Sequence, residues 1–165
     1  MMKQYFIELA AYNSWANDNA ISWLEKITEA QWEQPIVSSF ENIATTVIHV
    51  ANAESIWLQR LNEVELEKQV WLTKEFKGSK EEALKIWKQA SLDLEKFFTN
   101  FDETKIQDDF SFRRLNGEFY TVTYYQVFAH IFNHSTFHRG QLVTMLRQTG
   151  FTELSSTDIT QYFRK

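Results

Sequence analysis

The chain has 165 residues, the length of one domain, and no cysteine, which excludes disulfides, thiolate metal sites and a cysteine nucleophile. The net charge is -5, and Lys and Arg are interleaved with Asp and Glu, so there is no basic stripe of the kind that nucleic-acid-binding proteins use. No stretch reaches about 18 consecutive apolar residues, and the N-terminus lacks a signal-peptide pattern, so we expect a cytoplasmic protein with no membrane contact.

The first predicted helix covers residues 2–26, where apolar side chains recur near the 3.6-residue period of an amphipathic helix. The chain has only 4 Gly and 1 Pro, so long uninterrupted helices are permitted. Thr28 and Gln31 then have the spacing of a capping box, which predicts a short helical turn that Pro35 closes.

A second helix is predicted to begin at another capping-box pattern, Ser38 to Glu41, and to continue to about Asn62. Its apolar stripe is interrupted by one charged residue, Glu54. His49 lies near the middle of this helix, and burial there is expected because its face carries no charge. With helical steps of roughly 100°, that face consists of Thr45, Ala53 and Ile56.

Residues 63–78 are expected to form a connection with some strand character at residues 69–73. A third helix is predicted from the capping box of Ser79 and Glu82 to about Asn100. The charged residues along it are expected to lie on its solvent-exposed face.

Two short β-prone runs within residues 107–122 flank Asn116-Gly117, a dipeptide that strongly favours a β-hairpin turn. A fourth helix is predicted from Thr123 to a stop at Gly150, a residue that readily ends helices. The hairpin is therefore expected to lie directly before the last long helix.

In the tail, residues 151–165, Asp158 is expected to cap a short last helical turn. Four long amphipathic segments joined by modest connections predict an all-α fold, one four-helix bundle with a small β-hairpin. No internal repeat or linker interrupts the chain, so we expect a single domain over residues 1–165.

Three of the four histidines lie four residues apart in "HIFNHSTFHRGQ", at His130, His134 and His138. Residues at this spacing share one helix face, so His134 and His138 can chelate one metal ion. His49, at a matching depth on the second helix, is the candidate third ligand, and three histidines leave a coordination position for water or substrate. From spacing alone, a surface histidine pair and a hydrogen-bonded core histidine stay as alternatives.

Three stretches resemble motifs of the DinB/YfiT-like metal-binding family, which is unrelated to the DNA polymerase of the same name. They are "AAYNSWANDNAISWL", "ATTVIHVANAESIWLQRL" and "HIFNHSTFHRGQLVTMLRQTG". The resemblance covers essentially the whole chain and implies a four-helix bundle with a non-sequential helix order, often a homodimer. It also implies a divalent metal ion held by His49, His134 and His138, with His130 as a polar neighbour that is not itself a ligand.

Better-understood members of that family resemble transferases that use low-molecular-weight thiols such as bacillithiol or mycothiol. The resemblance therefore implies a metal-dependent thiol S-transferase or hydrolase acting on small electrophilic molecules. A stress-related metal-binding protein without turnover is the alternative, and the net charge of -5 argues against a DNA-associated role. Imidazoles suit zinc, nickel, copper and iron, among which we expect zinc or nickel.

Resemblance and helix position together suggest Arg60, Arg139 and Tyr12 as pocket residues for the charged part of such a thiol. The alternative for Arg139 is a surface or interhelical salt bridge. Gly140 is expected to permit close helix packing. Gln141 is expected to form a hydrogen bond to a ligand histidine or, as an alternative, to a neighbouring helix.

Overall fold

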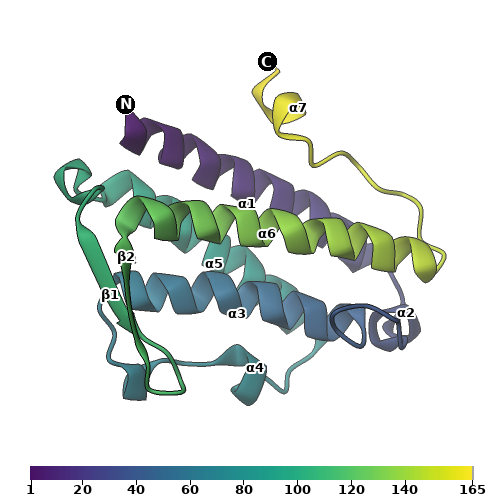
Figure 1. The fold of residues 1–165 in the computed structure, drawn as a ribbon. Helices are drawn as coiled ribbons and strands as arrows, with labels where there is room; N and C mark the ends of the chain where they lie inside the picture. The colour runs from purple at the N-terminus through teal and green to yellow at the C-terminus, as the bar shows by residue number, and fades with distance from the viewer. Residues whose placement is uncertain (165) are drawn as a thin grey trace.

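The structure is a computed structural model that describes residues 1–164, and its four long helices form the predicted four-helix bundle (Figure 1). α1 and α3 each contact both α5 and α6. The order around the bundle is therefore α1, α5, α3, α6, and the first two long helices lie diagonally opposite each other. The bounds of the long helices are α1 Met2–Lys26, α3 Ile43–Leu61, α5 Lys80–Asn100 and α6 Tyr124–Gln148.

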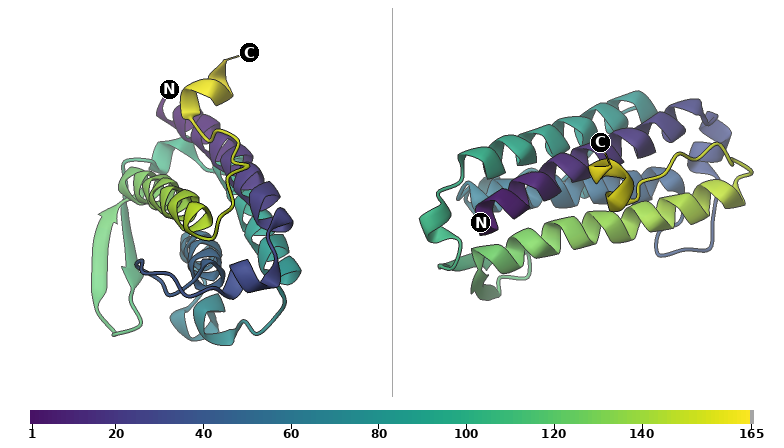
Figure 2. Two further views of the ribbon diagram at one scale, coloured as in Figure 1. Left: turned by 90° about the vertical axis from the view of Figure 1, so that its right-hand side faces the viewer. Right: turned by 90° about the horizontal axis from the view of Figure 1, so that it is seen from above.

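Two further views show that α1 and α6 run in one direction along the bundle and that α3 and α5 run in the other (Figure 2). Because α3 and α5 are parallel neighbours, the chain between them must return along the bundle. The connection contains a 3-10 turn, Leu66–Lys68, and the short helix α4, Leu72–Glu75. None of the described helices has the length and hydropathy needed to cross a membrane.

The strand character expected at residues 69–73 is wrong. The backbone N–H of Val70 donates to the side-chain Oε1 of Gln59 at 2.8 Å, and the amide of Gln59 donates to the Val70 carbonyl at 3.2 Å. A side chain of α3 thus forms the backbone hydrogen bonds that a neighbouring strand would form in a sheet. The chain then turns into α4.

The predicted start of the second long helix is also wrong, because α3 begins at Ile43 and not after Ser38. Its N-cap is Asn42, whose side chain accepts a hydrogen bond from the Thr45 backbone at 2.8 Å. Asn42 thereby satisfies an otherwise unpaired N–H of the first turn. The capping boxes predicted at Thr28, which opens α2 (Glu29–Glu33), and at Ser79 are present. At Thr123 the backbone N–H donates to Oε1 of Gln126 at 3.0 Å, which is one half of the predicted box.

The predicted hairpin is present as β1, Asp109–Arg113, and β2, Phe119–Thr123, which pair antiparallel. Gly117 has φ +88°, a conformation that glycine adopts without steric cost, and its N–H donates to the Arg114 carbonyl at 2.9 Å. The hairpin leads directly into α6, as the sequence predicted.

The interior contains two apolar clusters, one toward each end of the bundle. Trp23 and Trp87 belong to the first, and Phe98 and Phe128 to the second. Between them lies a set of buried polar side chains that we call the central polar layer. Its members, one or two from each long helix, are Asn13, Asn17, Glu54, Ser91, Ser135 and Arg139.

The C-terminal tail lies against α1. Tyr12 donates from its hydroxyl to the Thr157 carbonyl at 2.8 Å, and the Trp23 indole donates to the Ser155 hydroxyl at 2.8 Å. The tail ends in α7, Ile159–Phe163, with Asp158 as its N-cap, as predicted.

Candidate metal centre

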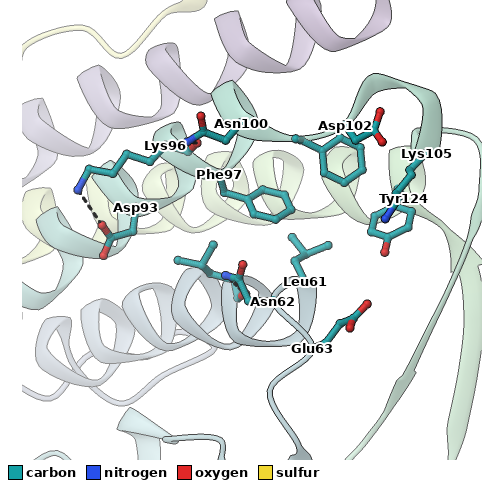
Figure 3. A pocket seen from close by; sticks show the side chains of 12 residues that line it. Leu61, Asn62, Glu63, Asp93, Lys96, Phe97, Asn100, Asp102, Lys105 and Tyr124 are labelled. Atoms are coloured by element: carbon teal, nitrogen blue, oxygen red, sulfur yellow. Dashed lines mark hydrogen bonds and ion pairs between the residues drawn. The ribbon is translucent and has the colours of Figure 1, made fainter.

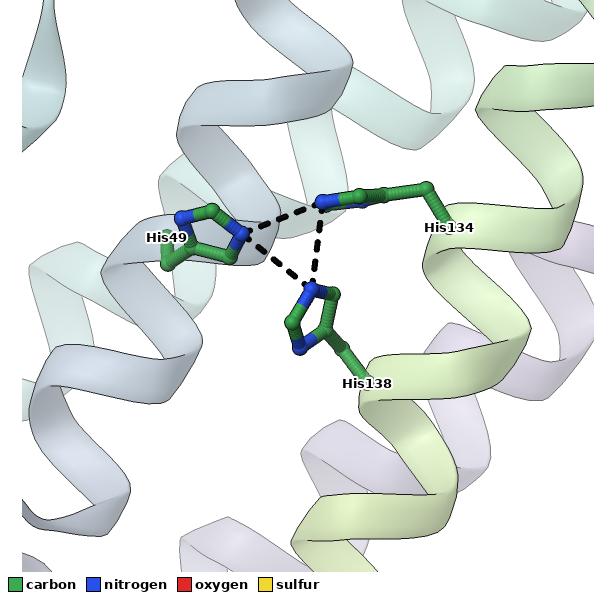
Figure 4. A group of neighbouring side chains, drawn as sticks. All are labelled: His49, His134 and His138. Atoms are coloured by element: carbon green, nitrogen blue, oxygen red, sulfur yellow. Dashed lines mark hydrogen bonds between the residues drawn. The ribbon is translucent and has the colours of Figure 1, made fainter. Parts of the chain in front are cut away.

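The side chains of His49, His134 and His138 converge in the groove between α3 and α6 (Figure 4). The Nε2 atom of His49 lies 3.0 Å from that of His134 and 3.2 Å from that of His138. The Nε2 atoms of His134 and His138 are 3.1 Å apart. Three nitrogens from two helices therefore form a nearly equilateral triangle.

Helix geometry explains why these three rings meet. His134 and His138 are separated by about one helical turn, so both project from the same face of α6. That face lies opposite α3, which contacts α6 and supplies His49 from near its middle. The structure thus brings together the three histidines that the sequence singled out.

The triangle has dimensions that suit a metal ion. Metal–nitrogen bonds of about 2.0–2.1 Å separate two ligand nitrogens by about 2.9 Å at a right angle and by about 3.3 Å at a tetrahedral angle. The three observed separations, 3.0, 3.1 and 3.2 Å, lie between these limits. A cation bound by all three nitrogens would lie on one face of the plane that they define. The remaining coordination positions of the cation would be open to water or substrate.

The hydrogen bond expected of Gln141 to a candidate ligand is present. Its Oε1 lies 2.7 Å from Nδ1 of His138, while its amide nitrogen donates to the hydroxyl of Ser39 at 2.8 Å. Because the amide nitrogen faces Ser39, the oxygen must accept, and the proton of His138 is on Nδ1. The Nε2 atom of His138 then presents a lone pair to the centre of the triangle.

Burial keeps the three rings neutral. It lowers the pKa of His49 to about 4, with a smaller contribution from His138. It also lowers the pKa of His134 to about 3, with contributions from the neighbouring histidines. For His138, burial lowers the pKa and the bond to Gln141 opposes the shift. Neutral imidazole is the form that binds metal, so the site needs no deprotonation at neutral pH.

An aromatic side chain covers one side of the cluster. The ring of Phe40 lies 4.5 Å from that of His49 and 5.7 Å from that of His138, between ring centres. Beyond it opens a cleft of about 540 Å³ that His49 lines. The apolar side chains in its wall are Trp32, Phe40, Ala44, Ile48, Leu72 and Phe76. His49, one of the three candidate ligands, therefore borders a space suited to a partly apolar molecule.

His130 lies beside the cluster but does not join it. Its ring centre is 5.8 Å from that of His134 and 5.2 Å from that of Trp57. The ring is packed against these neighbours and its pKa is lowered, first by burial and then by Arg60. This position agrees with the polar neighbour that the family resemblance implied.

Two of the suggested pocket residues lie elsewhere. Arg139 is only 2 % exposed and points into the central polar layer, where it donates to the side-chain oxygens of Asn13 at 2.6 Å and Asn17 at 2.8 Å. Within residues 1–164 it forms neither a surface nor an interhelical salt bridge. Tyr12 is near it, with the Arg139 guanidinium 5.6 Å from the ring centre. Both suggestions are wrong, because the Arg139 side chain faces α1 and Tyr12, itself a residue of α1, donates to the Thr157 carbonyl of the C-terminal tail.

The suggestion that Gly140 permits close helix packing is also wrong. A Cβ atom built on this residue would meet nothing within 4 Å among the described residues. Gly140 is exposed and lies two residues after His138.

Glu54 is the residue whose role the sequence did not explain. It is 1 % exposed, and it accepts hydrogen bonds from Asn13, Asn17 and Ser135 through Oε1 and from Ser91 through Oε2. In the sequence, the signal for this role was a carboxylate on an otherwise apolar stripe of the helix. Such a residue must find partners inside the bundle, and the polar residues at matching depth on the other helices were the candidates.

Another hollow, of about 570 Å³, lies between the C-terminal ends of α3 and α5 (Figure 3). It is lined by charged residues of both signs, and two of them, Lys96 and Asp93, pair with each other at 3.2 Å. No histidine lines it. We find no convergent chemistry there among the described residues.

Two comparisons with known proteins found similar sequences. A sequence model for the group described as the DinB family matches residues 1–164, a range that includes all four long helices. The curated Protein DinB of Bacillus subtilis (strain 168) is 25% identical to this chain over 153 residues. That match covers 91% of this chain and 89% of the relative.

Proposed function

This chain belongs to the DinB family, and from that premise we propose that it binds one divalent metal ion through His49, His134 and His138. The observation that carries the proposal is the triangle of Nε2 atoms, with sides of 3.0 to 3.2 Å. Three lone pairs at such distances repel one another unless a proton or a cation lies between them. With the His138 proton on Nδ1, too few protons remain to satisfy every side of the triangle.

We propose zinc or nickel as the ion. Three neutral imidazoles with no thiolate and no carboxylate among the clustered groups are a ligand set that both metals accept. Calcium and magnesium prefer oxygen ligands, so the donor set argues against them.

We further propose that the site is catalytic, as a thiol S-transferase or hydrolase acting on small electrophilic molecules. A divalent ion would lower the pKa of a bound thiol or water and so supply a nucleophile at neutral pH. The chain has no cysteine, so sulfur would have to arrive on a low-molecular-weight thiol. The apolar wall around Phe40 and Phe76 supports this proposal, because it can hold an electrophile beside the histidines and limit access of water.

Metal analysis of the purified protein tests the binding step. The wild type should contain about one equivalent of zinc or nickel, and the His49→Ala and His138→Ala variants should contain little. The matched control is His130→Ala, which removes a neighbouring histidine from the same face of α6 and should retain the metal. Full metal content in His138→Ala would reject the site.

A turnover assay tests the catalytic step separately. The metal-loaded protein is given bacillithiol with generic electrophiles, and hydrolysable esters and amides, each with and without a chelator. Activity that the chelator abolishes supports the proposal. Stoichiometric metal without turnover of any of these supports the non-catalytic alternative. The homodimer implied by the family resemblance stays a prediction.

A further inference from the structure

A second cleft adjoins the histidine cluster on the side away from Phe40. It has a volume of about 400 Å³ and is lined by Ala53 of α3 and His130 of α6. Ala53 lies about one helical turn after His49, and His130 lies about one turn before His134. Because α3 and α6 are antiparallel (Figure 1), both steps lead in the same direction along the groove. The cleft therefore continues the groove directly from the cluster.

Arg60 is a charged residue that lines this part of the groove. Its guanidinium lies 4.8 Å from the ring centre of Trp57, 4.9 Å from that of Phe112 and 5.6 Å from that of Trp71. A neighbouring hollow of about 340 Å³ has four residues in common with the cleft: Trp57, Arg60, Arg114 and His130. Three aromatic rings thus hold one planar cation at the junction of two hollows.

The guanidinium of Arg60 is held there without an anionic partner. Within residues 1–164 its side chain forms no ion pair and donates no hydrogen bond, and its Nε atom is buried with no acceptor. Glu63 lines another hollow together with Arg60, yet the two side chains do not pair. Buried donors in folded proteins nearly always have partners, so an unpaired guanidinium nitrogen in a cleft requires an explanation.

A second cation adds to the positive charge in this part of the groove. Arg114, from the hairpin, lines both hollows. Its Nη1 lies 3.5 Å from the Tyr120 hydroxyl, and its guanidinium lies 5.1 Å from the centre of the Tyr120 ring. Burial, followed by the repulsion from Arg114, lowers the pKa of Arg60 to about 10. Two like charges are unfavourable in a partly buried site, and an anion between them would remove the cost.

We propose that Arg60 and Arg114 bind the anionic group, a carboxylate or a phosphate, of the molecule that reacts at the histidine cluster. The planar guanidinium, fixed by Trp57 and Phe112, matches the two oxygens of such a group. The role in a reaction rests on the proposed function, whereas anion binding itself does not. Because the whole chain carries a net charge of -5, the selectivity for anions must come from this local pair and not from the overall field.

The test measures anion binding to metal-free protein by titration calorimetry, so that an anion cannot bind to the metal instead. The chelator used to remove metal is itself a polycarboxylate and is removed by gel filtration. Succinate and phenyl phosphate are the two probes, and they distinguish a carboxylate site from a phosphate site. The variants are Arg60→Met, which keeps an apolar side chain among the aromatic rings, and Arg114→Gln on the exposed hairpin. Arg147→Met, an exposed arginine in the last turn of α6, is the matched control.

At least one probe should bind the wild type saturably, and Arg60→Met should weaken that binding about tenfold or more, as expected for hydrogen bonds to a charged group. Arg114→Gln should weaken it as well, and Arg147→Met should leave it unchanged. If Arg60→Met does not fold, Arg114→Gln alone decides the outcome.

Two results would overturn the anion site. One is the absence of saturable binding of either probe to the wild type, and the other is equal affinity in the wild type and the arginine variants. Binding that appears only after metal is restored, and that ignores Arg60, would place the anion on the metal. That result would reject the arginine site while supporting the metal centre, so the two proposals fail separately.

Discussion

His138 and Arg139 are consecutive residues of α6, yet their side chains face opposite partners. The Nε2 atom of His138 lies 3.2 Å from that of His49 on α3, whereas Nη1 of Arg139 lies 2.6 Å from Oδ1 of Asn13 on α1. Ser135 follows His134 in the same way and donates to the buried Glu54 at 2.9 Å. The central polar layer therefore fixes the rotation of α6 about its own axis, and that rotation aims the two imidazoles into the groove.

We expect Glu54→Ala to destabilise the protein by about 3–5 kcal/mol, the cost of removing one partner from a buried charged network. The substitution leaves the donors of Asn13 and Ser135 without an acceptor and the buried charge of Arg139 without a nearby carboxylate. Urea unfolding measures the loss.

The control for this prediction is Glu25→Ala, an exposed glutamate on α1, which should change the unfolding free energy by less than about 0.5 kcal/mol. A loss below about 1 kcal/mol in Glu54→Ala would show that the layer contributes little to stability. Glu54→Gln, which keeps the shape and one acceptor oxygen, should fall between the two.

The sequence predicted the four long helices and the pairing of His134 with His138 because both depend on local periodicity. A spacing of four residues places His134 and His138 on one face wherever the helix lies. The contact with His49 depended on which helices are neighbours, and the family resemblance supplied that non-sequential order.

The features that the sequence did not predict depend on contacts between distant segments. Residues 69–73 have strand-like composition, but a side chain of α3, Gln59, takes up the hydrogen bonds of their backbone. Glu54 was visible as an exception in an apolar stripe, but its partners come from the three other long helices. Arg139 was suggested as a pocket residue by the family resemblance and its helix position, but a single helical step of roughly 100° from His138 turns its side chain inward.

We expect Gln141→Leu to weaken metal binding by about 10- to 100-fold, the range typical of lost hydrogen bonds to metal ligands. The bond of 2.7 Å between Gln141 and His138 fixes the proton on Nδ1 and holds the ring in place. Competition with a chromophoric chelator measures the affinity. Gln148→Leu, on the exposed end of the same helix, is the control, and an unchanged affinity in Gln141→Leu would show that the ring is held by packing alone.

We expect Gly140→Ala to stabilise the protein by about 0.5–1 kcal/mol, because glycine inside a helix costs that much relative to alanine. A Cβ atom at this position meets nothing within 4 Å among the described residues. Thermal unfolding measures the shift. The opposite sign is expected for Gly117→Ala, since Gly117 has φ +88° in the hairpin turn. A destabilised Gly140→Ala variant would indicate that an unseen partner, such as a second chain, packs against this side of α6.

The low pKa values of the histidines predict how metal affinity depends on pH. A histidine of ordinary pKa, about 6.5, begins to exchange its metal for a proton as the pH falls below that value. Each such ligand then lowers the metal affinity about tenfold per pH unit. Burial lowers the pKa of His49 to about 4 and that of His134 to about 3. These two rings thus stay neutral while a solvent-exposed histidine would become protonated.

We therefore expect the affinity for zinc, measured by chelator competition, to stay nearly constant from about pH 8 to about pH 6 and to fall steeply only in more acidic solution. The sign follows from the direction of the shifts: lowering the folded-state pKa moves proton competition to lower pH. The free energy of unfolding of the metal-free protein should decrease as the pH falls below about 6.5, because the unfolded chain then takes up protons that the folded rings exclude. An affinity that already falls steeply between about pH 7.5 and about pH 6.5 would show that the rings are not desolvated. The groove between α3 and α6 would then be more open than the contacts of Phe40 with His49 and His138 indicate.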